Sequence, residues 1–271
     1  MKRIFTFGLL VAAAFALTNC AQKESYAPVQ EEVAETVTLE IVANLPAETK
    51  TYNDGMSTKW SDRDQVSVIF TKTDGTSDKT DNPFEHEGNG KFVGKLEKEI
   101  IYGFLQNFKE GTLVVAYPFG SEGVIPTSTV QNGYDSMAHL AGANCPLHGS
   151  VPVSWSQSLT DLILSRKYTI PEVELEHITS VIEVAVKNST AAAINVNEVD
   201  FFVGGEVKAT TVVEKAGALA AGETALVYVV VEPGTYSNLS FTVNDSFVKT
   251  INAAEATFTA GKIKKVNFEV K

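Results

Sequence analysis

Apolar and polar residues alternate along most of this chain, which is the spacing of a β-strand with one buried face. Between positions 37 and 43, single residues separate the apolar side chains of Val37, Leu39, Ile41 and Ala43. The same alternation, or a short β-branched run, recurs at 66–70, 113–117, 173–186, 195–203, 225–231, 238–243 and 262–270. No segment keeps the period of an amphipathic helix over a helix length. The pattern therefore predicts an all-β protein.

Turn residues separate these segments at short intervals, as at Asp74-Gly75, Gly204-Gly205 and Asn244-Asp245. Short strands between such turns are typical of antiparallel Greek-key sandwiches. The stretch 120–158, rich in Gly, Ser, Asn and Pro, interrupts the alternation. A long irregular segment inside a compact protein is usually a functional loop or a boundary. We therefore predict two tandem β-sandwich domains, at 36–165 and 166–271.

The N-terminus has the layout of a secretory signal, with Lys2 and Arg3 before an apolar run from Ile4 to Leu17. The run is shorter than the roughly 20 apolar residues that a membrane-spanning helix needs. We therefore predict a cleaved signal peptide at residues 1–19. Residues 20–35 are mostly polar and lack an apolar period, and they are expected to form a flexible stalk.

The sequence Leu17-Thr18-Asn19-Cys20 resembles the lipobox of bacterial lipoproteins, although that family usually has Gly, Ala or Ser before the cysteine. The resemblance implies that Cys20 becomes the lipidated N-terminus. Gln22-Lys23-Glu24 looks like the tag that sends lipoproteins of Bacteroidetes to the outer face of the outer membrane. In the alternative interpretation, the signal peptide is cut elsewhere and Cys20 is an ordinary residue.

Charge and cysteine content exclude some partners and one kind of cross-link. The chain has 22 Lys and Arg against 33 Asp and Glu, a net charge of -11. A body this acidic is poorly matched to phosphates, so nucleic acid is not an expected partner. Cys20 and Cys145 are the two cysteines, and acylation of Cys20 would leave Cys145 without a disulfide partner.

Catalytic and metal-binding patterns are weak in this sequence. It has no Gly-x-Ser-x-Gly elbow, His-Glu-x-x-His motif or glycine-rich phosphate loop. Cys145 lies near His139 and His148 in the sequence, which allows a thiol nucleophile or, in the simpler interpretation, an ordinary loop cysteine. In Glu85-His86-Glu87 only the two glutamates would share a strand face. We expect no catalytic residue, no metal and no cofactor, and therefore not an enzyme.

Five segments, taken in order, resemble the fimbrillin family, the lipoprotein pilins of Bacteroidales. They are Glu48-Thr49-Lys50-Thr51, the stretch 59–70, Ala116-Tyr117-Pro118-Phe119, the stretch 173–184, and Pro233-Gly234-Thr235-Tyr236. The resemblance implies two tandem transthyretin-like sandwiches. In polymerising members of the family, a protease removes the lipid, the stalk and the first strand, and a strand of the next subunit fills the groove.

Carried onto this sequence, the resemblance implies that the displaced strand contains Val37, Leu39, Ile41 and Ala43. The candidate donor strand is the last one, with Ile263, Val266, Phe268 and Val270 as its apolar side chains.

The processing site departs from the family pattern. Such proteases commonly cut after arginine, whereas the loop after the first strand here has Lys50. A trypsin-like enzyme would cut after Lys50, and an uncut chain would keep its first strand and lipid. Both possibilities stay open from the sequence.

The implied function is a structural subunit or anchor of fimbriae, assembled by donor-strand exchange and serving cell adhesion at the outer membrane surface. Its partners would be other pilin subunits and surface ligands of a host or another bacterium, with the membrane reached through a lipid anchor. The alternative is a surface glycan-binding lipoprotein of a nutrient-uptake system. Trp155 is the candidate ligand contact for that role, and a total of two tryptophans disfavours it.

Overall fold

The computed structural model describes residues 36–45, 59–97, 110–121, 123–154, 167–169, 171–251 and 255–271. Within these ranges, every element is a strand except the short 3-10 helix η1 (Gly142–Asn144). None of the described helical segments is long and apolar enough to cross a membrane. The prediction of an all-β protein is confirmed.

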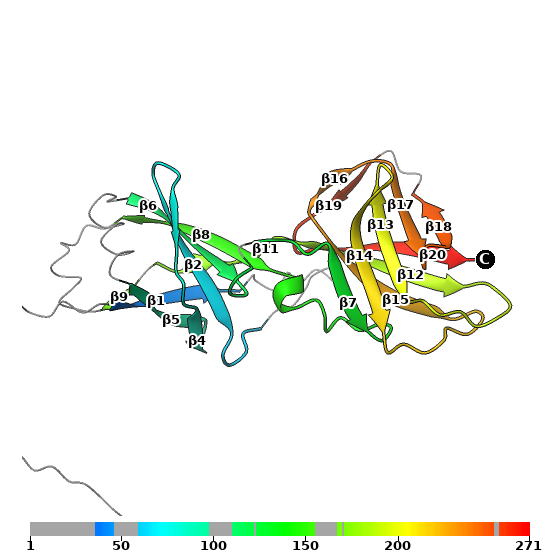
Figure 1. Cartoon of the computed structure of the whole chain (residues 1–271), viewed down its shortest axis with the longest axis horizontal. Coiled ribbons are helices and arrows are strands. Elements are labelled where there is room, and N and C mark those ends of the chain that lie inside the picture. Colours follow the sequence, from blue (N-terminus) through cyan, green and yellow to red (C-terminus); the bar gives the residue numbers. More distant parts are fainter. Residues whose placement is uncertain are drawn as a thin grey trace, which may run out of the picture. The chain divides into compact units, whose positions relative to one another are not determined.

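Ten strands form the first sheet system, in which β10-β1-β5-β4-β2-β6-β8-β11 are neighbours, β3 pairs with β2, and β9 pairs with β1 (Figure 1). Their bounds are β1 (Thr36–Asn44), β2 (Gln65–Lys72), β3 (Ser77–Lys79), β4 (Phe84–Gly88), β5 (Lys91–Glu97), β6 (Glu110–Tyr117), β8 (Leu147–Ser154), β9 (Lys167–Thr169), β10 (Val173–Glu174) and β11 (Glu176–His177). Strand β2 pairs with β4 at its first two residues and with β6 from Ser67 onward. Strand β2 therefore connects β4, β5 and β1 on one side with β6 and β8 on the other. Leu175 alone separates the two end strands, β10 and β11, so the two ends of this path lie next to each other in the chain.

The remaining strands form a second sandwich of a three-stranded sheet, β15-β12-β20, and a five-stranded sheet, β18-β17-β13-β14-β7, with β16 and β19 as a separate pair. Their bounds are β7 (Ser128–Asn132), β12 (Ser180–Asn188), β13 (Glu198–Val203), β14 (Glu206–Glu214), β15 (Thr224–Val231), β16 (Gly234–Tyr236), β17 (Leu239–Val243), β18 (Phe247–Thr250), β19 (Ala256–Phe258) and β20 (Ile263–Val270). The single strand expected over 173–186 is instead three strands, β10, β11 and β12, because the chain changes sheets after His177.

Most pairs are antiparallel, but four are parallel: β1 with β9, β1 with β10, β12 with β20, and β14 with β7. A tight turn joins only antiparallel neighbours, so each parallel pair brings together segments that are distant in the sequence. Two of these four pairs involve the first described strand, and one involves the last strand.

Residues 34–271 form one compact unit, in which the two sandwiches interleave along the sequence. Strand β7 lies before the predicted domain boundary near residue 165, yet it pairs with β14 of the second sandwich. Strand β9, after that boundary, pairs with β1 of the first sandwich. The exact domain limits stay a prediction, as do the signal peptide at 1–19 and the stalk at 20–35, which lie outside the described residues.

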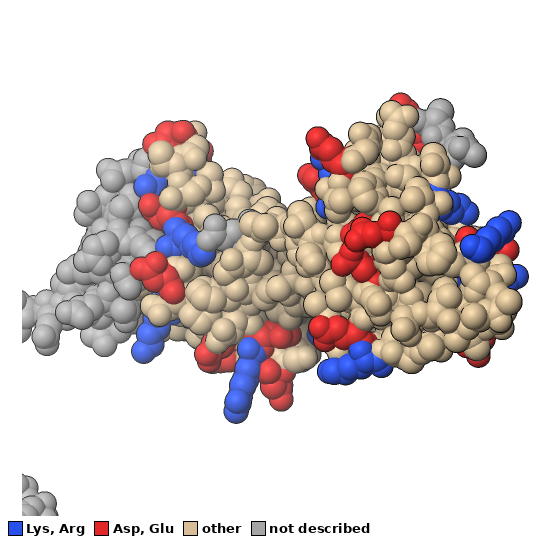
Figure 2. All heavy atoms as spheres, turned by 45° about the vertical axis from the view of Figure 1, so that its right-hand side comes forward, with Lys and Arg blue, Asp and Glu red and all other residues tan. Residues whose placement is uncertain are grey.

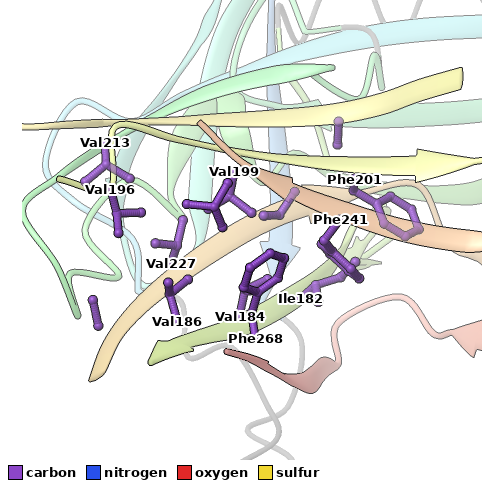
Figure 3. Packing of buried hydrophobic residues seen from close by; sticks show 14 of the residues in the cluster. Ile182, Val184, Val186, Val196, Val199, Phe201, Val213, Val227, Phe241 and Phe268 are labelled. Atoms are coloured by element: carbon purple, nitrogen blue, oxygen red, sulfur yellow. The ribbon is translucent and has the colours of Figure 1, made fainter. Parts of the chain in front are cut away.

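Each sandwich has an apolar core made by the inward-facing residues of its strands. In the first, Phe84 and Phe92 are fully buried together with alternate apolar residues of β1 and β2. In the second, Figure 3 shows Phe268 of β20 in the same core as Val184 of β12 and Phe241 of β17. Burial of aromatic and branched side chains is the main stabilising term in such cores.

Charged side chains are interspersed over the face shown in Figure 2. The ion pairs are partly exposed, as between Lys72 Nζ and Asp78 Oδ2 at 2.8 Å and between Lys265 Nζ and Glu183 Oε1 at 3.4 Å. Exposed pairs of this kind contribute about 0–1 kcal/mol each. The stability of the fold therefore comes chiefly from the two cores.

Candidate functional site

Strand β1 is an inner strand of the first sheet system, with neighbours on both of its edges. One edge pairs antiparallel with β5, from Thr36 opposite Glu97 to Val42 opposite Lys91. The other edge pairs in parallel with β9 and then with β10. Removal of β1 would therefore leave two strand edges with unpaired backbone groups, which is the arrangement that accepts an added strand.

The inward side chains of β1 fill the first core. Leu39, Ile41 and Ala43 are 1%, 0% and 0% exposed, whereas the side chains of Thr38 and Glu40 between them are half-buried. This burial confirms the face that the sequence pattern predicts for this strand. The side chain of Val37, the fourth member of the predicted set, lies outside the described side chains.

Gly94 lies opposite Leu39 in the pairing of β1 with β5. A side chain at position 94 would place its Cβ 2.6 Å from the ring of Phe84, closer than packed atoms approach one another. Only glycine leaves room for this ring. The phenylalanine therefore covers the backbone of β5 next to the groove that β1 fills.

The end of β1 is fixed by a set of hydrogen bonds. Trp60 Nε1 donates to the carbonyl oxygen of Ala43 at 3.1 Å, and the Ala43 amide donates to the Gly90 carbonyl at 2.8 Å. Asn44 Nδ2 donates to Glu172 Oε2 at 3.0 Å and to Glu174 Oε1 at 2.9 Å. Donors and acceptors from both sides thus define where β1 stops and set its register.

An aromatic group holds Trp60 in place beside this end. Its ring packs edge-on against Phe92 at 4.8 Å and against Tyr117 at 5.2 Å between centroids. Tyr117 Oη donates to Asp64 Oδ1 at 3.1 Å, and burial together with the charge of Asp64 raises the pKa of Tyr117 to about 12. Asp64 Oδ2 also accepts the Ser61 amide at 2.6 Å. Trp60 therefore packs beside the end of β1, and Asp64 stabilises the turn before β2.

The candidate donor strand β20 pairs in parallel with β12 of its own chain over eight residues. Of its four predicted apolar residues, Phe268 and Val270 are 1% and 0% exposed, Ile263 is buried, and Val266 packs against the core at partial burial. The structure therefore places the displaced strand and the donor strand in different sandwiches. Strand β20 lies at the edge of its three-stranded sheet.

Three predicted site residues lie outside the described residues, namely Cys20, Lys50 and Trp155. Their roles in lipidation, processing and ligand contact stay predictions. Sequence reasoning did not identify the Trp60 hydrogen bond to β1 or the covering of Gly94 by Phe84. A Trp at position 60 close to a strand was a visible signal, but its partner is distant in the sequence.

Cys145 does not have the surroundings of a catalytic thiol. It is 3% exposed and packs with Val181, Tyr228 and Val230. Burial raises the pKa of its thiol to about 11, although a hydrogen bond with Thr179 lowers it in part. A thiol with this pKa stays protonated at neutral pH and is a poor nucleophile. The interpretation as an ordinary buried cysteine fits this geometry.

Three carboxylates of the second sandwich, Glu198, Asp200 and Asp245, have oxygens within 4.8 Å of one another. Asp200 is buried, and its two oxygens accept hydrogen bonds from Thr210 Oγ1 at 2.5 Å and Thr242 Oγ1 at 3.1 Å. Burial and the two neighbouring acids raise the pKa of Glu198. The hydroxyls thus satisfy the buried acid, and the arrangement does not itself indicate a metal ion.

His139 and His148, which both lie in the stretch 120–158, are expected to make the stability of the fold depend on pH. Burial lowers the pKa of His139, where a hydrogen bond to the Tyr228 carbonyl opposes part of the effect, and burial also lowers the pKa of His148. As the pH falls, histidines in the unfolded chain take up protons near pH 6.5, and the two histidines in the folded chain take them up at a lower pH. The unfolded chain therefore binds more protons just below this pH, and the free energy of unfolding is expected to fall between pH 7.5 and pH 5.8.

Urea unfolding at the two pH values, at constant ionic strength, measures this fall. The variant with His139→Gln and His148→Gln is expected to show a smaller pH dependence than the parent chain. Glu198 acts in the opposite direction closer to pH 4.5, because its raised pKa lets the folded state hold a proton. Unchanged or greater stability at pH 5.8 would contradict the assignment.

No family model and no curated protein sequence matches this chain. Among solved structures, one from Bacteroides ovatus with the provisional name of a cell adhesion protein has a TM-score of 0.44 at 15% identity, covering 85% of this chain and 91% of that one. A fimbrial protein from Bacteroides ovatus has a TM-score of 0.37 at 13% identity, covering 87% of this chain and 50% of that one.

A third structure, from Bacteroides thetaiotaomicron and provisionally named for polysaccharide binding, has a TM-score of 0.35 at 10% identity. It covers 78% of this chain and 77% of that one. At TM-scores below 0.5, these likenesses carry no conclusion about function.

Proposed function

We propose that this chain is a fimbrillin-like surface lipoprotein, a structural subunit or anchor of fimbriae that is assembled by donor-strand exchange and serves cell adhesion. One observation carries the proposal. The first described strand, β1, lies inside its sheet with a partner on each edge, and its side chains Leu39, Ile41 and Ala43 are buried in the core. Removal of a strand in this position would leave a groove that a second strand could fill.

The chemistry of the groove matches an incoming strand with alternating apolar residues. Strand β5 would offer backbone groups over seven paired positions, from Lys91 to Glu97. The spaces left by Leu39 and Ile41 would accept side chains two residues apart. Backbone hydrogen bonds would supply the pairing, and these apolar spaces would select the sequence.

Strand β20 is the donor that we propose, because it is an edge strand and, among the described strands, it pairs with β12 alone. Leaving β12 removes Phe268 and Val270 from their own core, which is unfavourable. Exchange therefore requires that the acceptor groove bury a comparable apolar area. We place this event at the cell surface, with Cys20 lipidated and Lys50 as the processing site.

The test is the intact mass and N-terminal sequence of the protein recovered from the surface of the cells that make it. A chain that begins at Thr51, without lipid, would support a polymerising subunit whose groove is open. An acylated Cys20 with β1 retained would support an anchor. Recovery of a secreted chain with unmodified Cys20 and intact β1 would contradict both roles.

The glycan-binding alternative depends on Trp155, which lies outside the described residues. We do not propose it.

A further inference from the structure

The connection between β6 and β8 leaves the first sandwich and crosses to the second, where it supplies strand β7. We call residues 128–139 the strap. The strap begins with β7, which pairs in parallel with β14 from Ser128 opposite Thr210 to Asn132 opposite Glu214. It continues through a turn at Asp135 and reaches His139, whose ring lies 6.5 Å from the ring of Tyr228 on β15. The strap thus contacts strands of both sheets of the second sandwich.

Among the described strands, β15 has a backbone neighbour, β12, on one edge only. In an antiparallel pair, the amide and carbonyl groups of alternate residues point away from the partner. For Leu226 and Tyr228 these outward groups bond to side chains and to a turn, instead of to a neighbouring strand. The other edge of β15 is therefore where a further strand would otherwise add.

The strap provides most of these bonds. Gln131 Oε1 accepts the Tyr228 amide at 2.9 Å, and Gln131 Nε2 donates to the Leu226 carbonyl at 2.9 Å. Asp135 Oδ1 accepts the Leu226 amide at 2.8 Å, while the Asp135 amide donates to the Leu226 carbonyl at 3.0 Å. One amide side chain and one Asp residue thus reproduce the donors and acceptors that a neighbouring strand would present.

The Tyr228 carbonyl is occupied as well. It accepts from Thr211 Oγ1 at 3.0 Å and from His139 Nε2 at 3.1 Å. Gln131 is fully buried at 0% exposure, so its bonds are shielded from water. All four outward groups of Leu226 and Tyr228 therefore have partners other than a strand.

The sequence of β15 explains why this covering matters. Its residues, Thr-Ala-Leu-Val-Tyr-Val-Val-Val, include no charge, no proline and no glycine. An uncharged run of β-branched and aromatic residues on an open sheet edge readily pairs with another strand. Such an edge is also self-complementary, because two copies of one strand pair antiparallel across a two-fold axis.

We propose that the strap guards the β15 edge, and that an uncovered β15 pairs with β15 of a second copy of this chain. Gln131 and Asp135 are the guarding residues. The strap directs strand addition away from the second sandwich. This role is independent of β1, whose groove lies in the first sandwich.

The test uses the full soluble chain from residue 21 with either Gln131→Met or Asp135→Gly. Methionine keeps the length of the buried side chain without its polar atoms, and glycine suits the positive φ of 61° at position 135. The matched controls are Asn132→Met, an exposed position on the same strand, and Asp135→Asn, which keeps the acceptor oxygen. Asp135 is exposed, so its variant leaves the core intact even if Gln131→Met does not fold.

Hydrogen exchange is measured at low and high protein concentration, together with sedimentation equilibrium. At low concentration, the Tyr228 amide in Gln131→Met and the Leu226 amide in Asp135→Gly are expected to exchange at least about tenfold faster than in the parent chain. At high concentration, both variants are expected to form dimers in which this protection returns, and both controls should stay monomeric. Parent-like exchange would overturn the proposal, as would faster exchange without dimers.

Discussion

A soluble chain that begins at Thr51, and so lacks β1, is expected to lose the folded first sandwich as a monomer. The deletion removes Leu39, Ile41 and Ala43 from the core and uncovers edges of β5, β9 and β10. Loss of one buried Leu or Ile side chain costs about 2–5 kcal/mol. The combined loss is comparable with the roughly 5–15 kcal/mol that stabilise a whole domain. Thermal unfolding followed by circular dichroism, against the chain from residue 21, measures this effect.

Added peptides show whether the groove accepts a strand. A synthetic peptide of β1 (Thr36–Asn44) is expected to restore the folded sandwich, and a peptide of β20 (Ile263–Val270) tests the proposed donor. The matched control is the β1 peptide with Leu39→Asp and Ile41→Asp, whose charges would be buried without partners. If the truncated chain were as stable as the longer one, β1 would not be the strand that fills a groove in the first sandwich. If only the β20 peptide failed to bind, the groove would stand and the donor assignment would fail.

The substitution Phe268→Ala is expected to destabilise the second sandwich by about 3–5 kcal/mol, the usual cost of removing a buried phenylalanine ring. Phe268 is 1% exposed and lies in the core with Val184 and Phe241. The control is Asn267→Ala on the same strand, where the side chain is exposed and the expected change lies within about 0.5 kcal/mol. Urea unfolding of the full soluble chain compares the two variants.

The result bears on how β20 would act as a donor. A large effect means that β20 is part of its own sandwich before any exchange, so donation must replace the burial that it gives up. A small effect, equal to that of Asn267→Ala, would mean that the strand is held loosely by its own chain. That outcome would contradict the packing of β20 against β12.

The backbone groups at the strand edges are satisfied in different ways in the two sandwiches. In the first, the inner strand β1 is paired on both of its edges, and its removal would open a groove. In the second, side chains of the strap close the edge of β15 without adding a strand there. Under these proposals, strand addition would use the groove of β1, while the strap keeps the edge of β15 closed. A subunit with a single acceptor groove and a single donor strand would form linear assemblies.

The sequence by itself determined several of the strands and their buried faces. Alternation placed Leu39, Ile41 and Ala43 on one side of a strand, and all three are buried; the short apolar run at 113–117 is part of β6, with Leu113 and Val115 buried. This information is local, because successive side chains of a strand point to opposite faces whatever the strand pairs with. The stretch 120–158, which the sequence pattern predicts to be irregular, instead contains the two strands β7 and β8.

The tertiary structure alone decided which strands are neighbours. Nothing near β20 specifies a parallel partner more than 70 residues earlier in the sequence, and nothing near Gln131 specifies that its amide completes β15. Backbone groups of one strand fit those of almost any other, so pairing depends on which edges remain uncovered once all segments compete for the core. That competition is a property of the whole chain, and for this reason the groove of β1 and the strap over β15 became visible only in the folded molecule.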